Sequence, residues 1–130
     1  MTTENEVKKT PFTTFDHYTF YTTKGIGKVT VAMHVDNDTV NVGMSFCSPK
    51  DHFSKKKGRT IALARLNNGS KKNFTIKLAN GHPGLKKKVY LTFLQICMRG
   101  WFTENCKVPG WIRKAAYDDF HDSYEYEGEF

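Results

Sequence analysis

The sequence predicts a single α+β domain in which a three-stranded antiparallel meander is followed by a helix, a fourth strand and two more helices, in the order β-β-β-α-β-α-α. Three observations predict this fold. Apolar residues alternate with period two between residues 12 and 46, helical signals begin at Ser48, and a short alternating stretch near residue 75 precedes two further helical segments. With 130 residues, we expect a flexible arm at 1–10, the domain at 11–117 and an acidic aromatic tail at 118–130.

The apolar residues of each meander strand fall on one face, as expected for half-buried strands. They are Tyr18 and Phe20, then Val29, Val31 and Met33, then Val40, Val42, Met44 and Phe46. Residues 24–27 and 36–38 contain the Gly, Asn and Asp residues that hairpin turns favour. A meander has one core face and one open face. We expect the open face to carry Thr19, Tyr21, Lys28, Thr30 and His34.

The helical segments are bounded by capping residues. Ser48 is expected to cap a first helix that ends near Leu66, although Gly58 leaves open a start near Arg59. Phe74, Ile76 and Leu78 alternate as a fourth strand. The second helix is expected at about 85–99, and the third begins at Pro109 and carries Trp111, Ile112, Ala115 and Ala116.

Charge is distributed unevenly along the chain. All twenty Lys and Arg residues precede residue 118, together with seven of the thirteen acids, so 1–117 has a formal charge of +13 and 118–130 has −6. A body this basic is expected to attract polyanions such as nucleic acid, and solubility is the alternative explanation.

The basic residues form groups that we expect to share one cationic surface contacting a phosphate backbone. They are Lys55, Lys56, Lys57, Arg59 and Arg65, then Lys71 and Lys72, then Lys86, Lys87 and Lys88. The last group occupies the first turn of a helix, where cations oppose the macrodipole unless an anion binds there. Ordinary solvated faces are the alternative reading of these runs. Tyr21 and Lys28 are expected to add a stacking ring and a cation from the sheet, with DNA favoured over RNA.

The closing segment, DDFHDSYEYEGEF, combines acids with aromatic rings. It resembles the acidic, Phe-terminated tails of bacterial and phage single-stranded-DNA-binding proteins, although the preceding 117 residues do not resemble that family's five-stranded barrel. The resemblance implies that the segment recruits a host or phage protein through Asp118, Asp119, Asp122, Glu125, Glu127, Glu129 and Phe130. Tethered to a basic groove, such a segment would also compete with nucleic acid. An acidic solubilising segment is the alternative.

Catalysis and metal binding have little support in the sequence, so we expect no enzyme, no cofactor and no metal. Acids at residues 16, 36, 38 and 51 are the candidates for a magnesium site, and all are expected at turns or caps. Cys47 near His52 resembles a nucleophile–base pair, but a buried structural thiol is the favoured reading.

The cysteines and the absence of targeting signals indicate the cellular compartment of the protein. Cys47, Cys97 and Cys106 are unclustered and lie among apolar residues, which indicates thiols in a reducing compartment. No apolar window reaches the roughly 18 residues of a membrane span, and the first ten residues lack the apolar core of a signal peptide. We therefore expect a cytoplasmic protein without a membrane partner.

The chain also resembles small bacteriophage accessory proteins in size and basicity, which implies a viral protein that acts in a host cell. Our hypothesis is a non-enzymatic nucleic-acid-binding protein with weak sequence preference. The alternative is an inhibitor or modulator that grips an acidic host enzyme or defence factor.

Overall fold

The computed structural model describes residues 13–128 except 37, 68–72, 78–83 and 104–105, and it describes only the backbone of 103 and 123–128. Four antiparallel strands lie side by side in chain order: β1 (Thr13–Thr22), β2 (Gly25–Asp36), β3 (Thr39–Cys47) and β4 (Asn73–Lys77). The predicted α+β class and element order are confirmed. A small additional pair, β5 (Trp101–Thr103) and β6 (Cys106–Lys107), was not predicted because strands this short carry no readable period.

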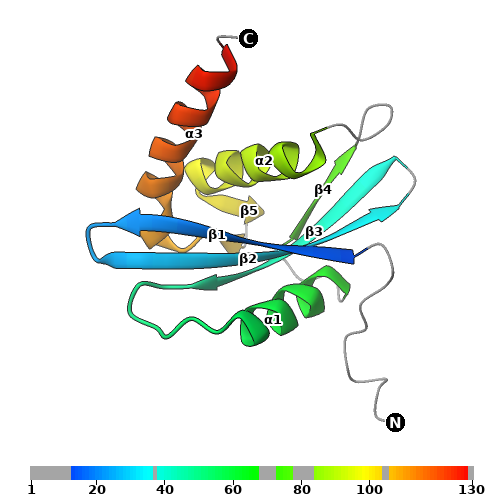
Figure 1. Cartoon of the computed structure of the whole chain (residues 1–130), viewed down its shortest axis with the longest axis horizontal. Coiled ribbons are helices and arrows are strands. Elements are labelled where there is room, and N and C mark those ends of the chain that lie inside the picture. Colours follow the sequence, from blue (N-terminus) through cyan, green and yellow to red (C-terminus); the bar gives the residue numbers. More distant parts are fainter. Residues whose placement is uncertain (1–12, 37, 68–72, 78–83, 104–105, 129–130) are drawn as a thin grey trace.

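The helices cover both faces of the sheet. Helix α1 (Lys55–Asn67) lies on one face and α2 (Leu85–Arg99) lies on the other (Figure 1). A 3₁₀ turn, η2 (Gly110–Ile112), leads into α3 (Arg113–Gly128), which packs beside α2 and then projects beyond the rest of the molecule (Figure 1). The result is a three-layer arrangement in which the sheet separates α1 from α2 and α3.

The main core lies between the sheet and the α2 layer. The alternating residues predicted to share a face do so, since Phe20, Val29, Val40 and other members of that set are buried in one cluster with Phe93 of α2. Phe46 and Phe93 stack with ring centroids 5.9 Å apart. Burial of this apolar layer, at about 25 cal/mol per Å² of surface removed from water, is the main stabilising contribution to the fold.

The sequence predicts that the second face of the meander is open. In the structure it is not, because α1 covers part of it. Ala32 of β2 and Ala62 and Leu63 of α1 form a small second core there. Two glycines allow the close approach. A Cβ on Gly43 would lie 2.4 Å from the backbone nitrogen of Leu66, and a Cβ on Gly58 would lie 2.5 Å from Thr30 Oγ1. Gly58 therefore belongs inside the helix, at its contact with the sheet.

Helix α1 begins later than Ser48. Ser54 is its cap, since Lys57 N donates to Ser54 Oγ over 3.2 Å. Ser48 instead stabilises a turn, in which its hydroxyl donates to the Asp51 carboxylate and Asp51 N donates to the Ser48 carbonyl. The chain offers two serines suited to capping, and the turn uses the first one.

The turn between β1 and β2 is tighter than expected. Only Thr23 and Lys24 separate the strands, and Gly25, with φ of +125°, already pairs with Thr22. The Thr22 hydroxyl donates to the Gly25 carbonyl and accepts from Lys24 N, over 2.8 and 3.1 Å. These bonds fix the end of the hairpin, which is important for the candidate site below.

The acidic segment begins within α3. The helix continues from Arg113 to Gly128, so the backbone of most of residues 118–130 is helical. Tyr90 Oη donates to Asp119 Oδ2 over 3.0 Å, and Phe120 packs against the main core.

Among the helices within the described part of the chain, none has the length and apolar character required to cross a membrane.

Candidate functional site

Three cations from separate parts of the chain surround one histidine. His17 of β1 and Lys28 of β2 lie on the face of the sheet that α1 covers, because His17 pairs with Thr30 and Lys28 pairs with Thr19. Lys55 and Arg59 stand four residues apart on α1, and therefore on one side of the helix. We call Lys28, Lys55, Arg59 and His17 the hairpin cluster.

The pKa of His17 reflects both its burial and the positive charges near it. Burial lowers the pKa of His17, the charges of Lys55 and Arg59 lower it further, Asp16 raises it, and Lys28 lowers it. His17 is therefore neutral at pH 7, and its Nδ1 lies 2.8 Å from Thr30 Oγ1. A bound anion would offset the repulsion among the positive charges of Lys28, Lys55 and Arg59.

Phe53 organises the cluster from the loop before α1. Its ring packs edge to face on His17, with centroids 5.7 Å apart, and Lys28 Nζ lies 5.6 Å from the centre of the same ring. Lys28 Nζ also donates to Thr19 Oγ1 over 2.8 Å. Neither partner of Lys28 carries a negative charge, so its own charge remains available to a ligand.

Counter-charges are scarce around the cluster. Across the described ranges of the chain, no carboxylate lies within ion-pair distance of Lys28, Lys55 or Arg59. Asp16 is the neighbouring acid of the strand, and its Oδ1 accepts from the backbone N–H of His17 over 3.0 Å. Among the described residues, the cluster therefore has an excess of positive charge.

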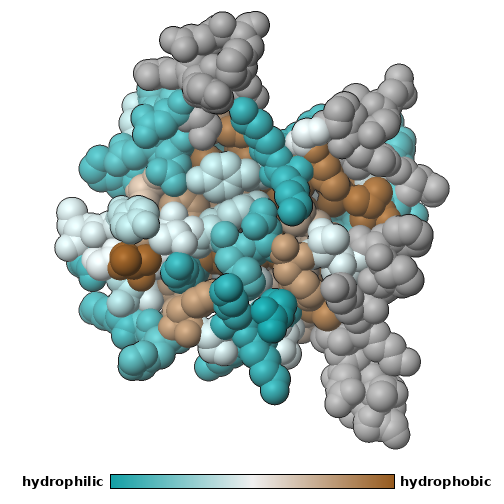
Figure 2. Space-filling model, viewed as in Figure 1, coloured by the Kyte–Doolittle hydropathy of each residue, from teal (hydrophilic) through white to brown (hydrophobic). Residues whose placement is uncertain are grey.

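Exposed apolar side chains lie next to the cluster at the end of the hairpin. Tyr21 and Ile26 pair across β1 and β2, with 75% and 52% of their surfaces exposed. Figure 2 shows an isolated hydrophobic spot at this end of the β1–β2 hairpin, surrounded by neutral and hydrophilic surface. Tyr21, for which the sequence predicts a stacking role, lies two residues along the strand from Thr19.

The other predicted basic residues are dispersed. Lys56 and Lys57 are exposed in the first turn of α1, where they border a shallow cavity with Thr60 and Ile61 rather than His17. Arg65 is half-buried, and its Nη1 donates to the Met44 carbonyl over 2.9 Å. Burial lowers the pKa of Arg65. This side chain links α1 to β3.

The lysines of α2 lie on the other side of the molecule. Lys86, Lys87 and Lys88 are exposed in the first turn of α2, so the sheet separates them from the hairpin cluster (Figure 1). Lys71 and Lys72 are outside the described residues. The expected single cationic surface is thus corrected to at least two groups on opposite faces, because the crossovers place α1 and α2 on different sides.

The acidic residues lie on the α2 side. Lys114 Nζ lies 3.1 Å from Asp118, and Asp119 accepts from Tyr90. Burial raises the pKa of Asp119, the Tyr90 hydrogen bond lowers it, and Asp122 and Asp118 raise it. The side chains of Glu125 and Glu127, and all of Glu129 and Phe130, lie outside the described residues. Occupation of the hairpin cluster by this segment would require α3 to leave its packing on α2.

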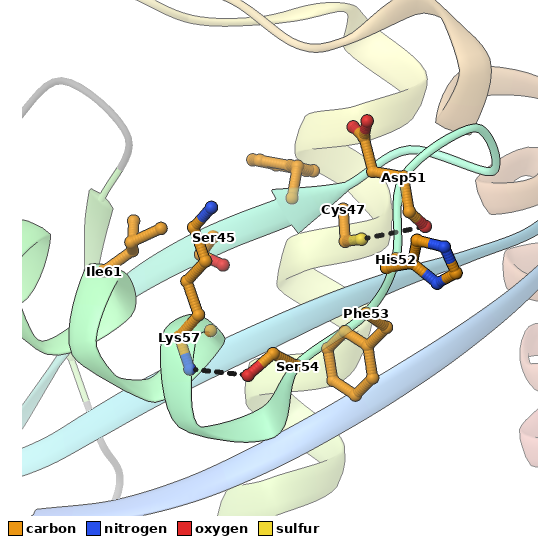
Figure 3. Close-up of a pocket in the computed structure, with 10 residues that line it drawn as sticks. Ser45, Cys47, Asp51, His52, Phe53, Ser54, Lys57 and Ile61 are labelled. Atoms are coloured by element: carbon orange, nitrogen blue, oxygen red, sulfur yellow. Dashed lines mark hydrogen bonds between the residues drawn. The ribbon is translucent and has the colours of Figure 1, made fainter.

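In the pocket near Cys47, the thiol bonds to backbone carbonyls rather than to His52. The volume of the pocket is about 480 Å³, and Cys47, Asp51, His52 and Lys57 contribute to its lining (Figure 3). The thiol donates to the carbonyls of Ser48 and Asp51, over 3.8 and 3.7 Å. Burial and the nearby Asp51 raise the pKa of the Cys47 thiol, while Lys57 lowers it. A protonated thiol bonded to carbonyls is a poor nucleophile.

No metal site is found among the described residues. Within the described residues, no group of three or more His, Cys, Asp or Glu side chains is close enough to hold an ion. Asp16 lies inside β1 rather than at the expected turn, and Asp51 is bonded to Ser48.

Two residues of the site region carried no signal that we read from the sequence. Phe53 lies in an irregular loop, where periodicity gives no information. Trp111 was expected in the third helix, but it lies in the 3₁₀ turn before α3, where it is half-buried and its ring lies over Gly27. A glycine inside a strand, such as Gly27, often marks close approach of another group, and this was the available signal.

Comparison of the chain with protein-family models, curated proteins and solved structures gave no match.

Proposed function

We propose that this protein binds nucleic acid, with the hairpin cluster and the exposed Tyr21 as its contact surface. The observation that supports the proposal most directly is the meeting of Lys28, Lys55 and Arg59 around a neutral histidine, with no ion-paired carboxylate among the residues that the structure describes. Cations gathered in this way neutralise phosphates, and the accompanying release of counterions favours binding.

Tyr21 adds a contact that phosphate neutralisation does not provide. Its ring is exposed beside the cluster, on a hairpin end that hydrogen bonds hold in place. Stacking of a base on such a ring contributes about 1–3 kcal/mol and tolerates every base. Because the surface offers cations and a ring rather than amide or carboxylate side chains suited to base edges, we expect weak sequence preference.

Salt dependence tests the proposal quantitatively. Fluorescence anisotropy with a labelled 20-nucleotide strand should show affinity falling with salt. In the triple variant Lys28→Gln, Lys55→Gln and Arg59→Gln, the slope of log K against log salt should become shallower by about two for a single strand. A matched control removes three charges elsewhere, at Lys77, Lys86 and Lys88, which lie on the far edge strand and on α2.

The two variants separate local contact from general attraction. A loss confined to the first variant supports the proposed surface. Equal losses in both would mean that net charge alone attracts the polyanion. Absence of salt-dependent binding in the unsubstituted protein would contradict the proposal and would favour an acidic protein as the ligand of the cluster.

A further inference from the structure

A second cavity adjoins the hairpin on the side away from α1. Its volume is about 660 Å³, and it lies between the end of the β1–β2 hairpin and the start of α3. Tyr21 and Lys24 come from the hairpin, and Trp111 and Lys114 come from η2 and α3. Two aromatic residues and two basic residues therefore contribute to the lining of one cavity.

The Trp111 wall of this cavity is fixed by the sheet. A Cβ on Gly27 would lie only 2.2 Å from Trp111 Cζ3, so the indole lies directly on the backbone of β2. The opposite wall is fixed by the two-residue turn and the hydrogen bonds of Thr22. A cavity with rigid aromatic walls can accept a flat ring without paying a large ordering cost.

The cavity and the hairpin cluster lie on the two sides of β1, which is an edge strand of the sheet. Tyr21 lines the cavity, and Thr19, two residues earlier, accepts the hydrogen bond of Lys28 Nζ. Two residues of a strand span about 6.6 Å, which is comparable to the spacing of neighbouring phosphates in an extended strand. A ligand that passes around this edge strand can therefore reach both places.

We infer that this cavity holds an unpaired base of a single-stranded nucleic acid whose phosphates contact the hairpin cluster. The inference rests on the proposed function and narrows it to single strands. In a duplex, both faces of every internal base are already covered by neighbouring bases, so none can stack on Tyr21 or Trp111 without being flipped out. Lys24 and Lys114 stand at the cavity to pair with the flanking phosphates, and Asp118, ion-paired to Lys114, opposes them.

Tryptophan fluorescence provides a direct readout. The chain has two tryptophans, and Trp101→Phe leaves Trp111 as the sole reporter. Trp101 is itself 49% exposed, so this substitution should leave the fold intact, and circular dichroism checks that it does. Titration with an oligothymidine strand should quench Trp111 emission, whereas a hairpin duplex with the same number of phosphates should bind without quenching.

Substitutions at Tyr21 and Asp118 give a second, independent readout. Tyr21→Ala should weaken binding of the single strand at least about fivefold and leave duplex affinity unchanged, while Tyr21→Phe should retain single-strand affinity. Asp118→Asn should tighten single-strand binding. Equal effects of Tyr21→Ala on strand and duplex, or strand binding without any change in Trp111 emission, would overturn the inference while leaving salt-dependent binding intact.

A free mononucleotide has the same chemistry as one unit of the strand, and a separate arm distinguishes them. Thymidine monophosphate should quench Trp111 only at far higher concentration than the strand, because it cannot reach the cluster and the cavity together. Quenching by the mononucleotide and the strand at similar base concentrations, unaffected by the Lys28, Lys55 and Arg59 substitutions, would instead assign the cavity to free nucleotides and contradict the inference. If neither oligonucleotide binds in a salt-dependent way, the proposed function itself is contradicted, and not only the role of the cavity.

Discussion

Gly58 of α1 faces Thr30 of β2 so closely that a methyl group at residue 58 would lie 2.5 Å from Thr30 Oγ1. The hydroxyl cannot simply turn away, because it is 2.8 Å from His17 Nδ1. The contact fixes the distance between α1 and the sheet, and with it the position of Lys55 and Arg59 relative to His17. Packing of a helix on a sheet thus sets the geometry of the candidate site.

Gly58→Ala should therefore lower the free energy of unfolding by about 1–3 kcal/mol through overpacking, even though alanine favours the helix by about 1 kcal/mol. Urea denaturation measures the effect. Gly110→Ala is the matched control, since no atom lies within 4 Å of the added Cβ, and it should leave stability nearly unchanged. Similar losses in both variants would show that backbone conformation, rather than the Thr30 contact, determines the result.

His17 should make stability depend on pH. Its pKa is lowered in the folded protein from the ordinary value of 6.5, so the unfolded chain takes up a proton at a higher pH than the folded one. The free energy of unfolding should consequently fall as the pH decreases below about 6.5. Comparing urea denaturation at pH 7.5 and 5.5 with that of His17→Gln isolates the contribution, which the variant should lack.

Bound nucleic acid should reverse this shift. A phosphate in the hairpin cluster would favour the protonated imidazole, so the pKa of His17 should rise on binding and affinity should increase as the pH falls. NMR titration of the imidazole resonances with and without an oligonucleotide measures the change. An unchanged His17 titration in the saturated complex would place the ligand elsewhere.

The hydrogen bond from Tyr90 to Asp119 should tie α3 to α2. Tyr90→Phe should cost about 1 kcal/mol, because it leaves a partly buried carboxylate without its donor. Asp119→Asn should be tolerated at pH 7, since it keeps an acceptor and removes the charge that burial disfavours. Burial raises the pKa of Asp119 in the folded state, so its contribution is present at low pH and is lost as the pH rises through that pKa. Denaturation of both variants at pH 4 and 7 tests the assignment.

The three thiols should differ in reactivity. Cys97 is buried, and burial raises its pKa, so it should react with iodoacetamide only when the protein unfolds. Cys47 and Cys106 are partly exposed and should be modified first, as mass spectrometry of timed samples can show. His52→Ala should leave the Cys47 rate unchanged. A marked slowing in that variant would revive the nucleophile–base pair.

The strands and α2 could be predicted because their signals are local. Alternation of apolar residues assigned each strand a core face, and Gly84 and Gly100, with φ of +68° and +102°, bound α2 at the predicted residues. Helix α3 was predicted only at its start, because its acidic continuation was read as a tail. Asp119 and Phe120 pack against α2 and the main core, and the helical backbone continues from there to Gly128.

The site was only partly predictable because it depends on which face each helix covers. The residue types of Lys28, Tyr21, Lys55 and Arg59 indicated a polyanion surface, and the structure brings these four into one region. Nothing in the linear order distinguishes Lys55 from Lys86, since both begin a helix after a strand. The direction of each crossover, which is a tertiary property, determines that they lie on opposite sides of the sheet.

The sheet order β1-β2-β3-β4 has a consequence for synthesis of the chain. Every strand pairing joins neighbours in the sequence, so the first three strands can associate as soon as residue 47 has left the ribosome. Their apolar face, which includes Val31 and Val42, then remains uncovered until α2 is made at residues 85–99. During that interval the nascent chain exposes an apolar, aggregation-prone β-surface. Fragments that stop before residue 85 are therefore expected to need a chaperone or to aggregate.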